Sequence, residues 1–308
     1  MVDPKRIEAF GSKYELLDHI ARGGMSDVYS ARVTGIEGFE KTVAIKRVRP
    51  DLAIDRDMVE MFLKEARLAG MLHHPNIAQV YDLGIVDGSY FLAMEYVRGV
   101  DVRWMLQQAT ERHREIPLEV VMAIGIGVLA GLHYLHEQVD VVHRDISPSN
   151  VMVGCDGSVK IIDFGIALPG SARGGGLRVP HGGKPSYMSP EQCLNWPLDR
   201  RTDIFSTAIL LWELSVLDKL FRGRDEAEVL SRIVQGDIMP PSVMRADFPD
   251  ELERIIMRGL ARHPNGRYPT AEAMREDIEQ FAHKLRIDFS TSTVALYLNA
   301  VLGVTVPV

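Results

Sequence analysis

The sequence contains very little cysteine. Only Cys155 and Cys193 occur in 308 residues, far apart and in no C-x-x-C pattern, so neither a disulfide framework nor a zinc site is indicated. Two ordinary buried or half-buried thiols are the simplest interpretation. They suit a reducing compartment, and the sequence therefore predicts a cytoplasmic protein.

A basic excess and a long apolar run are also missing. The net charge is −7 at pH 7, whereas nucleic-acid binding normally needs a positive surface, so nucleic acid is not an expected partner. The longest apolar run, residues 120–132, is shorter than the ~18 residues that a membrane-spanning helix needs. The N-terminus MVDPKRIEAF has no apolar segment of the kind found in secretory signals. No membrane segment is expected within this chain.

The composition that is present suits a large folded core, with 46% hydrophobic and 25% charged residues. The length allows one large domain or two. Short segments rich in β-branched and aromatic residues predict strands, and the glycines between them favour antiparallel pairing. One apolar stripe at helical spacing, residues 57–72, predicts a helix that ends before His74–Pro75. The predicted strands are 14–18, 27–33, 42–48, 77–83 and 90–96.

From about Gly99 the pattern changes to helices, predicted at 118–137, 201–218, 225–235, 250–261 and 270–284. The predicted fold class is α+β: a small antiparallel-sheet lobe with one main helix, then a larger helical lobe. Clefts between such lobes are preferred ligand sites. The expected boundaries are an N-terminal extension 1–13, a small lobe of about 14–94, a hinge 95–98, a large lobe 99–285, and a terminal helix and tail 286–308 that pack on the large lobe.

Several short motifs carry chemistry only in combination. Alone, ARGGMSDVY (21–29) is a hairpin, Lys46 in VAIK is a snorkelling strand residue, and Glu65 is a solvated helix charge. They are followed in order by HRDISPSN (143–150), IIDFG (161–165) and SPE (189–191). This order resembles the signature set of the protein-kinase catalytic domain. The resemblance covers residues 14–285, and phrases such as GGMSDVY and YMSPEQ are most similar to the bacterial eukaryotic-like (Hanks-type) serine/threonine kinases.

The resemblance implies a role for each polar motif residue. Lys46 would hold the nucleotide phosphates and Glu65 would orient Lys46 through an ion pair, because an unpaired buried charge is costly. Asn150 and Asp163 would bind Mg²⁺, or Mn²⁺ in its place, through oxygen atoms. Asp145 would accept or orient the proton of the attacking hydroxyl.

The resemblance also implies an ATP site. The adenine ring would lie between apolar side chains, the backbone of 95–97 would bind its edge, and Met94 would be the gatekeeper. The predicted nucleotide-binding residues are Ile20, Ala21, Arg22, Gly23, Gly24, Met25, Ser26, Asp27, Val28, Ala44, Lys46, Met94, Glu95, Val97 and Met152.

Two departures from the family pattern stand out. The G-x-G-x-x-G positions are Ala21, Gly23 and Ser26, which predicts a stiffer loop because side chains restrict positive φ. Ser147 replaces the lysine that commonly follows the catalytic aspartate by two residues, so one positive charge is missing where charge develops in the transition state. Lys184 lies where the family commonly has threonine, and our hypothesis is that it partly replaces the missing lysine.

The residues and the resemblance are compatible with three functions. The first is an active Mg²⁺-ATP-dependent protein serine/threonine kinase with protein substrates and self-association for autophosphorylation, for which Ser171 is the candidate site. The second is a pseudokinase or weak kinase that acts as a nucleotide-binding regulatory module, motivated by Ala21, Ser26 and Ser147. The third, a small-molecule kinase, is disfavoured by SPE, Asp203 and Arg267. The physiological substrate, the oligomeric state and any extension beyond residue 308 remain open.

Overall fold

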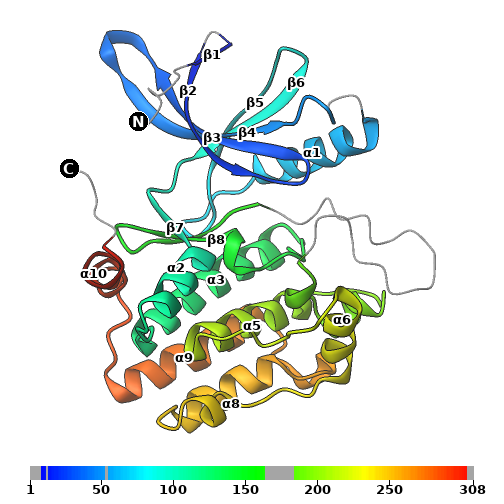
Figure 1. Ribbon diagram of the computed structural model, residues 1–308, viewed down its shortest axis with the longest axis vertical. Coiled ribbons are helices and arrows are strands. Elements are labelled where there is room, and N and C mark those ends of the chain that lie inside the picture. Colours follow the sequence, from blue (N-terminus) through cyan, green and yellow to red (C-terminus); the bar gives the residue numbers. More distant parts are fainter. Residues whose placement is uncertain (1–7, 12, 53–54, 164–183, 304–308) are drawn as a thin grey trace. The chain divides into compact units, whose positions relative to one another are not determined.

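The computed structural model describes residues 8–11, 13–52, 55–163 and 184–303, and the chain divides into two units, Met1–Val97 and Arg98–Val308. The first unit contains a six-stranded sheet in the order β1-β2-β3-β4-β6-β5, in which every neighbouring pair is antiparallel. Figure 1 shows this sheet beside helix α1. The strands are β1 (Glu8–Phe10), β2 (Tyr14–Arg22), β3 (Ser26–Thr34), β4 (Glu40–Val48), β5 (Val80–Val86) and β6 (Ser89–Glu95).

Helix α1 (Arg56–Ala69) is fixed to the first unit by its cap and its apolar face. The Asp55 side chain accepts hydrogen bonds from the amides of Asp57 and Met58, which satisfies donors that the first helical turn leaves open. Phe62 and Ala66 are buried in one cluster with Val48 and Leu92 of the sheet. This packing fixes the face of α1 that also carries Glu65.

The second unit is mainly helical and includes a three-stranded sheet in the order β7-β8-β9 (Figure 1). Its strands are β7 (Gly99–Asp101), β8 (Val151–Gly154) and β9 (Val159–Ile161). Its helices are α2 (Val102–Glu111), α3 (Leu118–Gln138), α4 (Pro190–Cys193), α5 (Arg201–Val216), α6 (Glu226–Gln235), α7 (Pro241–Met244), α8 (Asp250–Gly259), α9 (Ala271–Leu285) and α10 (Thr291–Leu302).

Helices α3 and α5 form the centre of the second unit. Gly125 on α3 lies so close to Leu211 on α5 that a Cβ atom at residue 125 would be 2.6 Å from a Leu211 methyl group. A second close approach occurs at Gly157, where a Cβ atom would be 1.8 Å from the Thr291 carbonyl oxygen. The turn between β8 and β9 therefore packs directly against the first residue of α10.

Helix α3 extends beyond the apolar run of residues 120–132 in the sequence. It spans 21 residues and, by length and composition alone, is long and apolar enough to cross a membrane. However, 61% of its most apolar window is buried inside the second unit. Burial against the other helices accounts for its apolar character, as in the core helix of a folded domain.

The α+β fold class is confirmed, with differences in individual elements. Helix α2 was not predicted, although Asp101 caps it and Val102, Met105 and Ala109 form its buried face. Strand β5 begins at Val80, three residues later than expected. Within the expected terminal region 286–308, the helix α10 begins at Thr291. The short strands β1 and β7 were also missed.

Candidate active site

In the first unit, Lys46 and Glu65 form a buried ion pair. Lys46 lies on β4 and Glu65 on α1, and the Lys46 Nζ atom is 2.7 Å from Glu65 Oε1. Their exposed fractions are only 6% and 5%. Two charges withdrawn from water need close mutual contact to offset their lost hydration, and the pair therefore fixes the position of the lysine relative to the strand.

The glycine-containing turn joins β2 and β3. The Gly23 amide donates to the Ser26 carbonyl oxygen at 2.8 Å, and the Met25 carbonyl accepts from the Arg49 amide at 3.0 Å. Neither Gly23 nor Gly24 is among the glycines with positive φ. The conformational argument for a stiffer loop therefore does not apply in this structure, because the turn does not use the backbone region that glycine alone favours.

The predicted adenine contacts of the first unit lie on adjacent strands. Ala44 on β4 pairs with Met94 on β6, and Lys46 on β4 pairs with Val28 on β3. Ala44 and Met94 are buried, whereas Ile20 is 49% exposed. The Glu95 amide donates to the Gln79 carbonyl oxygen at 2.7 Å, so of the three hinge residues it is not the donor for an adenine edge. Met152 belongs to β8 in the second unit.

In the second unit, Asp145 and Asn150 face each other across a tight turn. The Asn150 Nδ2 atom donates to Asp145 Oδ2 at 2.7 Å and to the Asp145 carbonyl oxygen at 2.9 Å. A short 3-10 turn, Pro148–Asn150, carries Asn150 into this position. The amide group is thereby oriented, because both of its donor contacts go to Asp145.

Buried Asp203 holds the chain on the other side of this turn. It accepts hydrogen bonds from the His143 and Arg144 amides and contacts His136 Nε2, each at 2.8 Å. Burial alone would raise the pKa of Asp203, but the hydrogen bond and charge of His136 and the backbone contacts outweigh it and hold the pKa below its ordinary value. Arg144 has a φ of 69°, and these contacts compensate for that uncommon conformation.

Asp145 has the electrostatics of a proton acceptor. Its burial raises the pKa of the carboxyl group above the ordinary value, although Lys184, His143 and the Asn150 hydrogen bond each act in the opposite direction. A raised pKa moves a carboxylate closer to the range in which it can take a proton at neutral pH. His143 is fully buried, and burial lowers its pKa, which suits a packing residue beneath the turn.

Asn150 and Asp163 suit a divalent cation of the Mg²⁺ type. The Ile162 amide donates to the Asn150 carbonyl oxygen at 2.9 Å. Asp163 is the next residue in the chain, so this backbone hydrogen bond keeps it near Asn150. With its nitrogen turned to Asp145, the Asn150 side chain presents Oδ1 as an oxygen donor. One amide and one carboxylate oxygen match a cation that keeps several waters and binds substrate phosphates.

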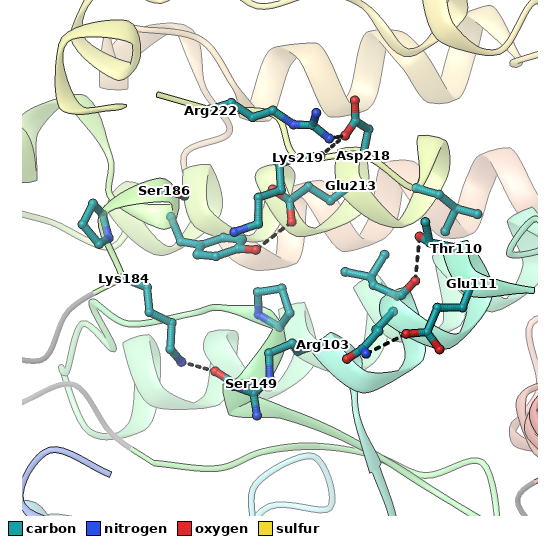
Figure 2. Close-up of a pocket in the computed structure, with 16 residues that line it drawn as sticks. Arg103, Thr110, Glu111, Ser149, Lys184, Ser186, Glu213, Asp218, Lys219 and Arg222 are labelled. Carbon is teal, nitrogen blue, oxygen red and sulfur yellow. Dashed lines mark hydrogen bonds and ion pairs between the residues drawn. The ribbon is translucent and has the colours of Figure 1, made fainter. Parts of the chain in front are cut away.

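Lys184 contacts the same turn from a distant part of the sequence. Its ammonium donates to Ser147 Oγ at 2.9 Å and to Asn150 Oδ1 at 3.1 Å, and it also contacts Ser149 Oγ. Figure 2 shows Lys184 directed at Ser149. Burial lowers the pKa of Lys184, while Asp145 and Asp163 act in the opposite direction.

The segment after Lys184 is fixed by buried polar contacts. Glu191 accepts two hydrogen bonds from the Arg267 guanidinium, at 2.7 and 2.8 Å. Ser189 caps α4 through a capping box with Gln192, and Gln192 Nε2 donates to the Arg144 carbonyl oxygen at 2.9 Å. Gln192, the residue directly after the SPE motif, thereby links this segment to the HRD motif.

A pocket of about 680 Å³ opens beside this turn, between α2, the 184–187 segment and the end of α5 (Figure 2). Its apolar wall includes Leu106, Pro148 and Pro185. Figure 2 shows the Arg222–Asp218 ion pair and the contact of Glu213 with an adjacent tyrosine ring. The tyrosine is Tyr187, whose hydroxyl donates to Glu213 at 2.7 Å. The charges on its walls are mixed, with cations Arg103, Lys184, Lys219 and Arg222 and anions Glu111, Glu213 and Asp218.

The structure brings together some predicted residues and adds others. Asp145, Asn150, Asp163 and Lys184 gather around one turn of the second unit, and Lys46 pairs with Glu65 in the first. Ser149 and Gln192 were not predicted, because their contacts with Lys184 and Arg144 join positions 35 and 48 residues apart. Phe164 and Ser171 lie outside the described residues.

Comparison with known proteins identifies the class. The protein kinase domain family matches residues 14–278, and the chain therefore belongs to the protein kinase family. This family generally uses ATP with a divalent metal ion. Its bacterial Hanks-type members are among the relatives.

Among curated proteins, the chain is 41% identical over 279 residues to the tyrosine-protein kinase MasK of Myxococcus xanthus, covering 87% of this chain and 43% of that protein. It is 36% identical to a probable serine/threonine-protein kinase of Streptomyces coelicolor, covering 91% and 41%. The PknI kinase domain of Mycobacterium tuberculosis, solved as a double mutant, is 25% identical with a TM-score of 0.69, covering 92% of this chain and all of that one. The chain thus spans about two fifths of the length of the curated relatives.

Proposed function

We propose that this chain transfers the γ-phosphate of ATP to serine and threonine hydroxyls of protein substrates. The observation that carries the proposal is the Asp145–Asn150 turn, in which a half-buried carboxylate with a raised pKa lies beside an oriented oxygen donor. Phosphoryl transfer needs positioning and charge neutralisation more than covalent chemistry, and these residues are of the types that supply both.

Each residue has a defined part in the proposal. Asp145 would accept the hydrogen bond of the acceptor hydroxyl and take its proton as the oxygen attacks. Lys46, held by Glu65, would bind nucleotide phosphates. Asn150 and Asp163 would hold Mg²⁺, with Mn²⁺ as the substitute. When bound, that cation would neutralise phosphate charge.

The acceptor class is the finer part of the proposal. A probable serine/threonine-protein kinase and proteins named PknB are among the relatives, which supports serine and threonine. MasK is named a tyrosine-protein kinase, and its 41% identity makes tyrosine the second candidate. The reaction is expected in the cytoplasm, where ATP is available, and one copy would serve as a substrate of another.

The test is phosphate transfer from labelled Mg²⁺-ATP, with the protein alone and with a general protein substrate. Asp145→Asn is expected to reduce transfer roughly 10²- to 10⁴-fold, the usual contribution of a positioned base. Acid hydrolysis of the product and separation of phosphoserine, phosphothreonine and phosphotyrosine would decide the acceptor class.

Two outcomes would contradict the proposal. Absent transfer by the wild type together with thermal stabilisation by ATP would favour a nucleotide-binding regulatory module. Transfer that Asp145→Asn leaves unchanged would show that another protein in the preparation is the kinase.

A further inference from the structure

Lys184 is a half-buried cation held only by neutral oxygen atoms. Its ammonium donates to the hydroxyls of Ser147 and Ser149 and to the side-chain carbonyl of Asn150. Of the residues that the structure describes, no carboxylate forms an ion pair with it. Ser147 is fully buried, and its short side chain leaves the space beside the turn to the ammonium.

This environment orients the charge without neutralising it. Hydroxyl and amide dipoles satisfy the N–H donors, but they carry no net charge to balance the ammonium. Asp145 and Asp163 favour the charged form of Lys184 without an ion-pair contact. A partly desolvated cation without a contacting counterion is unfavourable, and the arrival of an anion relieves that cost. The surroundings of Lys184 therefore have the properties of an anion site.

The position of the ammonium restricts which anion can be bound. It is 3.1 Å from Asn150 Oδ1, the oxygen proposed to hold the metal ion. Asn150 in turn contacts the Asp145 carboxylate, the proposed proton acceptor, at 2.7 Å. An anion bound by Lys184 would thus lie next to both the metal ligand and the base. In a phosphoryl transfer, the group that must lie there is the phosphate being transferred.

We propose that the Lys184 ammonium binds the terminal phosphate of the nucleotide and stabilises the charge on that group during transfer. This inference rests on the kinase function proposed above. It assigns to a residue outside the HRDISPSN turn the positive charge that Ser147 does not provide.

The backbone of Lys184 is anchored firmly enough for this role. The Tyr187 amide donates to the Lys184 carbonyl oxygen at 3.0 Å, and the Tyr187 hydroxyl donates to Glu213 on α5 at 2.7 Å. Ser206 on α5 donates to the Tyr187 carbonyl oxygen at 2.8 Å. The lysine is therefore delivered to the turn by a segment that is fixed to a buried helix.

The test compares two nucleotides that differ in the terminal phosphate. The measured quantity is the ratio of the dissociation constant of Mg²⁺-ADP to that of Mg²⁺-AMP-PNP, a non-hydrolysable ATP analogue, determined by calorimetry. Lys184→Ala is expected to lower this ratio roughly tenfold or more, the usual effect of losing a hydrogen bond to a charged group. Lys184→Arg, which keeps the charge, is expected to retain most of the ratio.

The matched control is Lys284→Ala, which removes an exposed lysine of α9 that pairs with Glu251; it should leave the ratio unchanged. A structural role for Lys184 would weaken both nucleotides equally, so a ratio within twofold of wild type in Lys184→Ala would overturn the inference. If neither nucleotide binds the wild type, the proposed function fails together with the inference.

Moving the lysine from position 184 to position 147 provides a second test. Ser147→Lys alone would place two ammonium groups at one site, because Ser147 Oγ is 2.9 Å from Lys184 Nζ, and should weaken AMP-PNP binding less than tenfold while reducing phosphate transfer. The combination Ser147→Lys with Lys184→Ala should recover at least tenfold in AMP-PNP affinity over Lys184→Ala alone. Additive effects of the two changes would contradict the assignment.

Discussion

Lys46 and Lys184 are both withdrawn from water, but they are held in different ways. Lys46 donates to the Glu65 carboxylate at 2.7 Å, so its charge is matched within the first unit. Lys184 donates to Ser147, Ser149 and Asn150, which match its hydrogen-bonding capacity but not its charge. Lys46 is therefore part of the fold as one half of an ion pair, whereas the charge of Lys184 remains available for a ligand.

Removal of Glu65 should have the largest effect on stability. Glu65→Ala takes one member out of a buried ion pair, and such changes cost about 3–5 kcal/mol because the buried ammonium of Lys46 loses a counter-charge. All three tryptophans (Trp104, Trp196 and Trp212) lie in the second unit. Hydrogen exchange of β4 and α1, rather than tryptophan fluorescence, should therefore be used to measure the loss.

The control for Glu65→Ala is the double variant Lys46→Met with Glu65→Leu. Apolar side chains of similar size remove both charges, and the double variant should recover most of the lost protection. A loss below about 1 kcal/mol in Glu65→Ala would show that the pair does not stabilise the first unit.

Replacement of Asp203 should have an intermediate effect on the free energy of unfolding, and that effect should depend on pH in a defined way. Asp203→Asn weakens three hydrogen bonds to a charged acceptor, and we expect a loss of about 1.5–3 kcal/mol near neutral pH by urea unfolding with tryptophan fluorescence. The pKa of Asp203 is lowered in the folded protein from an ordinary value of 3.8. Its contribution is therefore fully present above pH 3.8 and is lost as the pH falls through the lower folded value.

The direction of the Asp203 pKa shift can be checked by measuring stability at several pH values. The difference in unfolding free energy between wild type and Asp203→Asn should narrow as the pH falls below 3.8. A difference that widens in acid would mean that the folded pKa is raised. The contacts of Asp203 with His136 and the Arg144 amide would then not have the effect assigned to them.

Lys184→Ala should have the smallest effect on stability in the absence of nucleotide. Hydrogen bonds from a charged donor contribute about 1.5–3 kcal/mol, but removal of a partly desolvated ammonium that has no ion-pair contact offsets most of that loss. We expect a change within about 1 kcal/mol by urea unfolding. A loss above about 3 kcal/mol would place Lys184 with Lys46, as a lysine that stabilises the fold.

The sequence was informative where local pattern and family motifs agree. The strands around Lys46 and the helix that carries Glu65 follow from β-branched segments and one apolar stripe, and the α+β class follows from their order. Helix α2 was missed, although Asp101 caps it through the Trp104 amide at 2.6 Å. A search for capping residues ahead of Val102, Met105 and Ala109 would have found it.

Long-range contacts set the limit of sequence reasoning at the site. A relation between Ser147 and Lys184 was suggested only by the family resemblance, and the contacts with Ser149 and Asn150 join residues 35 and 34 positions apart. No local periodicity encodes such contacts, because they depend on how the 184–187 segment packs on α5. The backbone conformation of the glycine turn was likewise not predictable from the residue types at Ala21 and Ser26.

The 2.9 Å contact between Lys184 Nζ and Ser147 Oγ also has a consequence for sequence drift. If one ammonium group is required at this spot and two are not tolerated, neither position can change freely. A lineage could exchange the roles of the two positions only through an intermediate with both lysines or with none. Related sequences are therefore expected to carry lysine at one of these two positions and a small or neutral residue at the other, a pattern that an alignment of relatives can test.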